Sequence, residues 1–168
     1  MSPRWKRITL AGTAGYIMYC FSESFFWTRP TEAHLWSYGT GWLLYTFLTF
    51  NLFTLINYFK VRSPGALFLA GSIYGWLIEG VIMQTMYDAC PWQISFTALA
   101  WHAIITVMIG WFYVRKVLYE NRPLKTLLLG CGLGLFYGLW SLNTWTQAGG
   151  EITPLPEYAI FAFVSTFL

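Results

Sequence analysis

The sequence predicts an all-α protein made of membrane-spanning helices. Of its 168 residues, 57% are apolar, and only 10 are basic and 7 acidic. A soluble domain normally carries about a quarter charged residues. The mean hydropathy is +0.50, and five stretches each reach the roughly 20 apolar residues that a helix needs to cross a bilayer. These observations exclude a soluble fold and predict a single helical domain over residues 1–168.

Each predicted span ends at charged or helix-breaking residues. Lipid offers no partner to free backbone groups, so an apolar stretch of this length satisfies them internally as a helix. Basic residues precede the first span and follow the second and fourth, and a Ser63-Pro64-Gly65 turn opens the third. The five full spans cover residues 8–27, 40–59, 66–87, 95–114 and 126–145.

A sixth apolar stretch covers residues 158–168. At about 1.5 Å per residue it makes about half a crossing. We expect a fragment cut within a sixth span, and a re-entrant or interfacial segment is the alternative.

The basic residues predict the orientation. Nine of the ten lie in the N-terminal segment, the turn between the second and third spans, and the loop between the fourth and fifth, whereas Arg29 alone lies on the other side. Cations in short loops are retained in the cytoplasm. We therefore predict a multi-pass protein of the plasma or inner membrane with a cytoplasmic N-terminus.

Small residues repeat every three or four positions on three of the predicted spans. Such repeats let helix backbones approach closely in lipid, so we expect contacts within the bundle, with a homodimer seam as the alternative. The residues are Gly12 and Gly15, Gly71 and Gly75, and Gly130, Gly134 and Gly138.

Three ionisable residues fall within the spans: Glu23, Glu79 and His102. A charge at the centre of a spanning helix costs at least about 2.5–3.5 kcal/mol, so such residues usually face a cavity or a partner. Helical rise places Glu79 about 12 Å and His102 about 10 Å from the outer ends of their spans. Because a short loop joins these spans, we expect antiparallel neighbours in which Glu79 meets His102.

Polar and aromatic side chains on several spans lie at a depth similar to that of Glu79 and His102. They predict one pocket in the outer half of the membrane. The catalytic candidates are Glu79, His102, Glu23 and Asp88. The substrate-binding candidates are Trp76, Tyr19, Met83, Trp101, Asn143 and Trp140. The structural alternatives are an interfacial Glu23, a Glu79 and a His102 that only hydrogen-bond between helices, and aromatic residues that pack the core.

Carboxyl groups and an imidazole in an apolar chamber can act as general acid and base. The segments Gly75-Trp76-Leu77-Ile78-Glu79-Gly80 and Ala100-Trp101-His102 loosely resemble integral-membrane isoprenoid cyclases and carotenoid hydratases. That resemblance implies protonation of an isoprenoid alkene or epoxide. Hydrolysis of a lipid bond is a further option, since the pocket suits a lipophilic substrate that enters from the lipid.

The remaining motifs exclude other chemistries. Two histidines are too few for a multi-His iron centre, three cysteines lack CxxC spacing, and GxSxG, HExxH and P-loop motifs are absent. We therefore predict no metal, no cofactor and no nucleic-acid partner. The expected partners are membrane lipids, a lipophilic small molecule, and a second copy or a larger membrane complex. The predicted function is that of an intramembrane acid/base enzyme or a binding protein for a lipophilic molecule. A non-catalytic subunit of a membrane complex and a small proton-coupled transporter are the alternatives.

Overall fold

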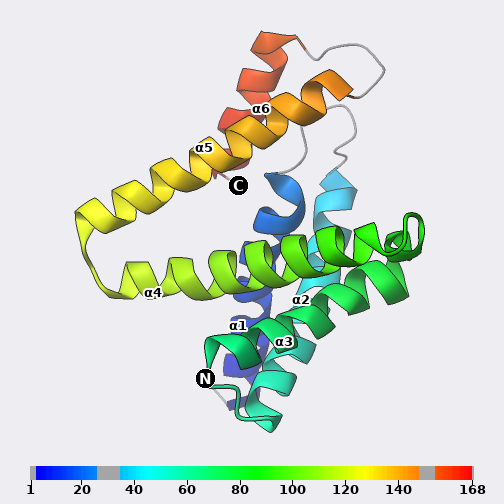
Figure 1. Cartoon of the computed structure of the whole chain (residues 1–168). Helices are drawn as coiled ribbons and strands as arrows, with labels where there is room; N and C mark the ends of the chain where they lie inside the picture. The colour runs from blue at the N-terminus through cyan, green and yellow to red at the C-terminus, as the bar shows by residue number, and fades with distance from the viewer. Residues whose placement is uncertain (1–2, 26–34, 148–153, 168) are drawn as a thin grey trace.

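The computed structural model describes residues 3–25, 35–147 and 154–167, and all regular structure within these ranges is helical (Figure 1). Several helices run directly into one another. In chain order the elements are α1 (Pro3–Tyr19), η1 (Cys20–Ser24), α2 (Leu35–Tyr58), α3 (Pro64–Trp76), η3 (Leu77–Ile82), the short η4 (Thr85–Tyr87), η5 (Ile94–Tyr113), α4 (Val114–Tyr119), α5 (Pro123–Gln147) and α6 (Leu155–Phe167). The predicted all-α class is confirmed.

Four helices in the described ranges are long and apolar enough to cross a membrane: Trp36–Tyr58, Pro64–Ile82, Ile94–Tyr119 and Pro123–Ser141. They coincide with the second to fifth predicted spans. The first predicted span is helical from Pro3 to Ser24 but is not among the four, because it begins in a basic cluster and ends at a polar Ser-Glu-Ser sequence. The sixth apolar stretch forms the 13-residue helix α6, and its assignment as a partial span stays a prediction. The predicted orientation stays a prediction.

Local sequence explains where the third span begins. The Ser63 side chain accepts a hydrogen bond from the Ala66 backbone N–H at 3.2 Å, and a proline occupies the first turn of α3. A serine cap satisfies an N–H group that the helix leaves unpaired, and proline lacks the N–H that would need a partner there. The helix thus begins two residues earlier than the sequence predicts, since Pro64 and Gly65 of the predicted turn form the first turn of α3.

Segments η1, η3 and η5 are wider, π-type helices in which each N–H reaches the carbonyl five residues earlier. Met83 N donates to Ile78 O at 2.8 Å, and Phe25 N donates to Cys20 O at 3.0 Å. Such turns often mark functional sites in helices. All three ionisable residues of the predicted spans lie on them.

The helices associate in two close pairs, α1 with α2 and α3 with η5, which pack together (Figure 1). Glycines make both approaches possible. A Cβ at Gly15 would lie 2.6 Å from the Thr46 Cα, and one at Gly75 would lie 2.3 Å from the Ala98 carbonyl oxygen. Contacts within the bundle are thus confirmed for these glycines, and the predicted neighbours, the third and fourth spans, do touch.

The glycines of α5 behave differently. Among the described residues, a Cβ at Gly130, Gly134 or Gly138 would meet nothing within 4 Å, and α5 diverges from α4 in a V (Figure 1). The expectation that these glycines contact the rest of the bundle is therefore wrong. A small-residue repeat permits close approach but does not decide which helix, if any, takes it.

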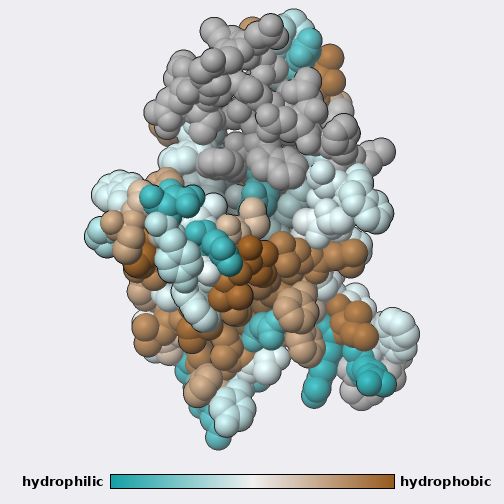
Figure 2. Space-filling model, turned by 90° about the vertical axis from the view of Figure 1, so that its right-hand side faces the viewer, coloured by the Kyte–Doolittle hydropathy of each residue, from teal (hydrophilic) through white to brown (hydrophobic). Residues whose placement is uncertain are grey.

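The core lies between the two pairs and next to the start of η5. Its larger cluster gathers aliphatic residues and tyrosines, and a smaller one joins Phe21, Trp101 and Tyr137. On the outside, hydrophobic residues form a broad band across the face in Figure 2, and hydrophilic residues gather along its lower edge and at its upper left. This pattern is compatible with burial of the middle of the molecule in lipid.

Candidate functional site

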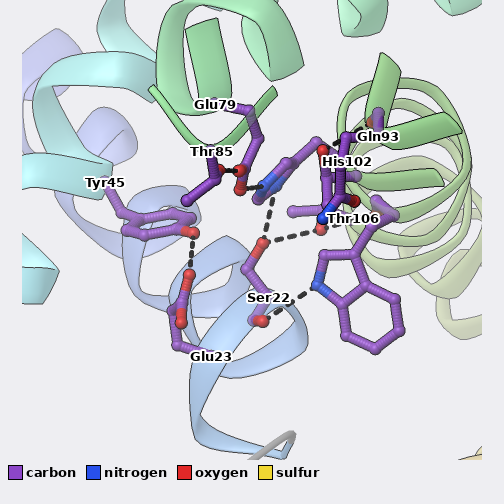
Figure 3. A network of polar contacts seen from close by, with 10 residues as sticks. Ser22, Glu23, Tyr45, Glu79, Thr85, Gln93, His102 and Thr106 are labelled. Carbon is purple, nitrogen blue, oxygen red and sulfur yellow. Dashed lines mark hydrogen bonds and ion pairs between the residues drawn. The ribbon is translucent and has the colours of Figure 1, made fainter. Parts of the chain in front are cut away.

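A chain of hydrogen bonds joins η1, η3 and η5 inside the molecule (Figure 3). His102 Nε2 lies 2.7 Å from Glu79 Oε1, and His102 Nδ1 lies 2.9 Å from Ser22 Oγ. The His102 side chain is 1% exposed and that of Glu79 is 13% exposed. The contact that the sequence predicts between Glu79 and His102 is therefore present.

The chain continues at both ends. Thr85 Oγ1 donates to the second carboxyl oxygen of Glu79. At the other end, Ser22 Oγ lies 2.9 Å from Thr106 Oγ1, which in turn donates to the Trp101 carbonyl oxygen at 3.1 Å. Every polar atom of the central imidazole and carboxyl group thus has a partner, as buried polar groups require.

One arrangement of the protons satisfies these contacts together. A carbonyl oxygen only accepts, so the Thr106 hydroxyl proton points to Trp101 O, and Thr106 accepts from Ser22. Since the Ser22 proton is used in this way, Ser22 Oγ accepts from Nδ1–H of His102. Nε2 then either accepts from a protonated Glu79 or, as an imidazolium, donates to an ionised one. One proton is shared between Glu79 and His102.

The backbone around Ser22 is held by side chains from other helices. Trp101 Nε1 donates to the Ser22 carbonyl at 3.0 Å, and the Tyr137 hydroxyl donates to the Phe21 carbonyl at 2.6 Å. The last carbonyls of a helix have no partner within it. These two donors supply partners at the end of η1 and fix the direction in which Ser22 points.

Gly75 sets the distance across the site. Its missing side chain lets η5 approach α3, since a Cβ there would lie 2.3 Å from the Ala98 carbonyl oxygen and 3.0 Å from the His102 Cβ. Glu79 follows four residues later and so faces the same helix as Gly75. The close approach thereby places the carboxyl group against the imidazole.

Glu23 lies beside this network on the same segment as Ser22 (Figure 3). Its Oε1 accepts a hydrogen bond from the buried Tyr45 hydroxyl at 2.7 Å. The structure thus brings a second carboxyl group to the site, held by a tyrosine from α2.

Three other predicted site residues are exposed and do not take part in the network. Trp76 is 47% exposed and its indole lies against Gly80 of its own helix; Met83 is 59% exposed; Asp88 is exposed. The expectation that they line the buried pocket is not met. The chain leaves the span at Gln84, whose φ of 61° ends the helical path, so residues beyond it do not continue the face of Glu79.

The predicted Tyr19 and Trp101 are buried, and Trp140 is half-buried. Tyr19 is 2% exposed and contacts the Tyr45 ring edge to face, with centroids 5.5 Å apart. The Trp101 and Trp140 ring centroids are 5.1 Å apart. The side chain of Asn143, the remaining candidate, lies outside the described part of the structure.

The sequence reasoning did not select Ser22 or Thr106 as site residues, and it missed Thr85, Tyr45 and Tyr137 altogether. Ser22 and Thr106 could have been selected because each carries a hydroxyl group close to the predicted depth of His102. Thr85 lies past the end of its span, and the two tyrosines are indistinguishable from the other aromatic residues of the chain.

Among the described residues, no three His, Cys, Asp or Glu side chains gather as metal ligands would. The hydrogen-bonded network around Glu79 and His102 is the candidate functional site. No protein-family model, curated protein or solved structure matches the sequence.

Proposed function

We propose that this protein is an intramembrane acid/base enzyme for a lipophilic substrate, in which Glu79 exchanges a proton with the substrate. The observation that carries the proposal is the gradient of exposure along the hydrogen-bond chain. Glu79 is 13% exposed, whereas His102 is 1% and Ser22 is 2% exposed. A group that reacts must be reachable, and Glu79 is the more exposed of the two titratable groups in the chain.

The other members position Glu79. A protonated Glu79 gives its proton to the substrate, which leaves a carboxylate beside a neutral His102 whose proton stays on Nδ1. The carboxylate takes a proton back from the product as the cycle closes. General acid–base catalysis of this kind contributes about 10²- to 10⁴-fold to a rate. Thr85 and Ser22 keep the carboxyl group and the imidazole in one orientation.

Nucleophilic attack by Ser22 is disfavoured by the same contacts. A serine nucleophile gives its proton to an imidazole, but the Ser22 proton is engaged by Thr106 and the imidazole donates to Ser22. Ser22 therefore acts as an anchor for His102.

Aromatic side chains support a lipophilic substrate. Phe96, Trp101, Phe136, Tyr137 and Trp140 form one group next to the network, with ring centroids 5.1–6.5 Å apart. Their faces would stabilise positive charge that develops when an apolar molecule is protonated. An isoprenoid alkene or epoxide is one substrate of this class.

The test compares the lipids of cells that express the wild type, Glu79→Gln or Asp88→Asn at equal levels in the membrane. Glutamine keeps the hydrogen-bonding shape of Glu79 but has no exchangeable acid proton. We expect wild type and Asp88→Asn to convert the same lipophilic metabolite and Glu79→Gln to leave it unchanged. Equal conversion by Glu79→Gln, or no conversion by the wild type, contradicts the proposal.

A second candidate function is that of a subunit in a larger membrane complex. It is favoured by α5, whose glycines at positions 130, 134 and 138 leave open space toward the described part of the chain and whose leucines at positions 124, 127, 128, 135 and 139 are 60–68% exposed. In that case a defined partner co-purifies in mild detergent, and Glu79→Gln leaves both assembly and function intact.

A further inference from the structure

The basic ends of three helices meet around one cavity at the end of the molecule away from η1. The cavity has a volume of about 720 Å³ and lies between the start of α1, the end of α2 and the junction of η5 with α4. Arg7 and Arg115 line it together with Phe50, Phe53 and Trp111. These ends carry the basic residues that predict the cytoplasmic side.

We propose that this cavity binds one anionic phospholipid, with its phosphate between Arg7 and Arg115 and an acyl chain along Phe50 and Phe53. The proposal is independent of the role of Glu79. Basic pockets between spanning helices on the cytoplasmic side are typical sites for acidic headgroups. A volume of this size also lies within the range of about 300–1,000 Å³ of small-molecule sites.

Charge favours an anion at this place. Within the described residues, the ion pairs are Glu79 with His102 and Glu120 with Lys125, so neither Arg7 nor Arg115 has an acidic partner there. Both arginines are exposed. Two guanidinium groups at one opening match the geometry of a phosphate, which arginine binds through paired N–H groups.

Arg115 is already oriented toward such a ligand. Its guanidinium lies 4.3 Å from the centroid of the Trp111 ring, and Trp111 packs against Phe53 with centroids 5.2 Å apart. A guanidinium on an aromatic face keeps its N–H groups free for a second partner. Less side-chain entropy is then lost when a phosphate binds.

A smaller cavity of about 200 Å³ shares Trp111 and Arg115 with the first and adds Arg62. A third cation therefore stands at the same rim. The aromatic residues that line the cavity favour a lipid over a free phosphate ion. Phe50 is 49% and Tyr58 is 79% exposed next to the arginines. Such apolar surface is covered by an acyl chain but not by an inorganic ion.

The experiment measures lipid binding to the purified full chain by native mass spectrometry in detergent. The probes are dioleoyl phosphatidylglycerol, dioleoyl phosphatidylcholine with the same chains, and inorganic phosphate as competitor. We expect one phosphatidylglycerol to bind in preference to phosphatidylcholine and to resist displacement by phosphate. Arg7→Gln with Arg115→Gln should weaken it about thirtyfold, the effect of two basic contacts of about 1 kcal/mol each.

Lys116→Gln is the matched control, since Lys116 is adjacent to Arg115 and exposed but does not line either cavity. We expect it to keep binding within about twofold, because a more distant charge is screened by salt. Equal binding of the two lipids, or equal losses in the arginine and lysine variants, overturns the proposal. Displacement by phosphate alone overturns the assignment to a lipid.

Discussion

Replacing both partners of the Glu79–His102 contact tests whether it is a coupled pair. The two groups are 2.7 Å apart, and His102 is 1% exposed, so each single replacement leaves a covered polar atom without its partner. Hydrogen bonds between helices in membranes average about 0.6 and reach about 1.7 kcal/mol. Because this contact joins an acid to an imidazole, we expect a coupling free energy at the upper end, about 1–2 kcal/mol.

The assay is a double-mutant cycle on the free energy of unfolding in detergent, with Glu79→Met, His102→Leu and the double variant, each similar in volume to the native side chain. The double variant should be destabilised less than the sum of the single ones by the coupling free energy. His102→Leu also removes the bond to Ser22 and should be the more harmful single change. Additive effects within about 0.3–0.5 kcal/mol would refute the reasoning.

Two further predictions concern the packing of α3 and a surface ion pair. Gly75→Ala should destabilise the protein by about 1–3 kcal/mol, because a Cβ there meets the Ala98 carbonyl. Gly134→Ala places its Cβ in open space and should be neutral or slightly stabilising. Thermal unfolding in detergent distinguishes the two variants. The hydrogen bond and charge of Lys125 lower the pKa of Glu120, so their ion pair stabilises above the ordinary pKa of 4.5 and is lost as pH falls through the lowered value. Lys125→Gln should raise the Glu120 pKa toward 4.5 in an NMR titration, and an unchanged midpoint would contradict this.

Much of the helical architecture follows from composition and length. Four apolar stretches bounded by charge or proline are the four long apolar helices of the structure. The capped start of α3 is readable as Ser63-Pro64. Local sequence suffices here because lipid forces every spanning segment to satisfy its own backbone.

The Glu79–His102 contact was predictable because two spans joined by a short loop must be neighbours. An ionisable residue on each, at matching depth, then has one obvious partner. The hydroxyl partners were harder to identify, because η1 and η5 are π-helical and an α-helical period does not give their faces. Ser22 reaches His102 from a helix far away in the sequence.

The position of α5 relative to the other helices was not predictable from the spacing of its glycines. The same spacing joins α3 to η5 at Gly75 and leaves Gly134 in open space. The difference lies in what faces each helix, and that is a property of the assembled molecule. The outward position of Asp88 has a similar origin, since the path of the chain after η3 is set by its turn at Gln84.

The shared proton can be observed directly, because the sequence contains only two histidines, His34 and His102. Nitrogen-15 NMR of histidine-labelled protein in bilayers, assigned with His34→Gln, reports which ring nitrogen of His102 carries a proton. The account predicts a protonated Nδ1 that stays protonated in Glu79→Gln, and an Nε2 resonance that shifts in that variant. A bare Nδ1, or an Nε2 resonance indifferent to Glu79→Gln, would contradict it.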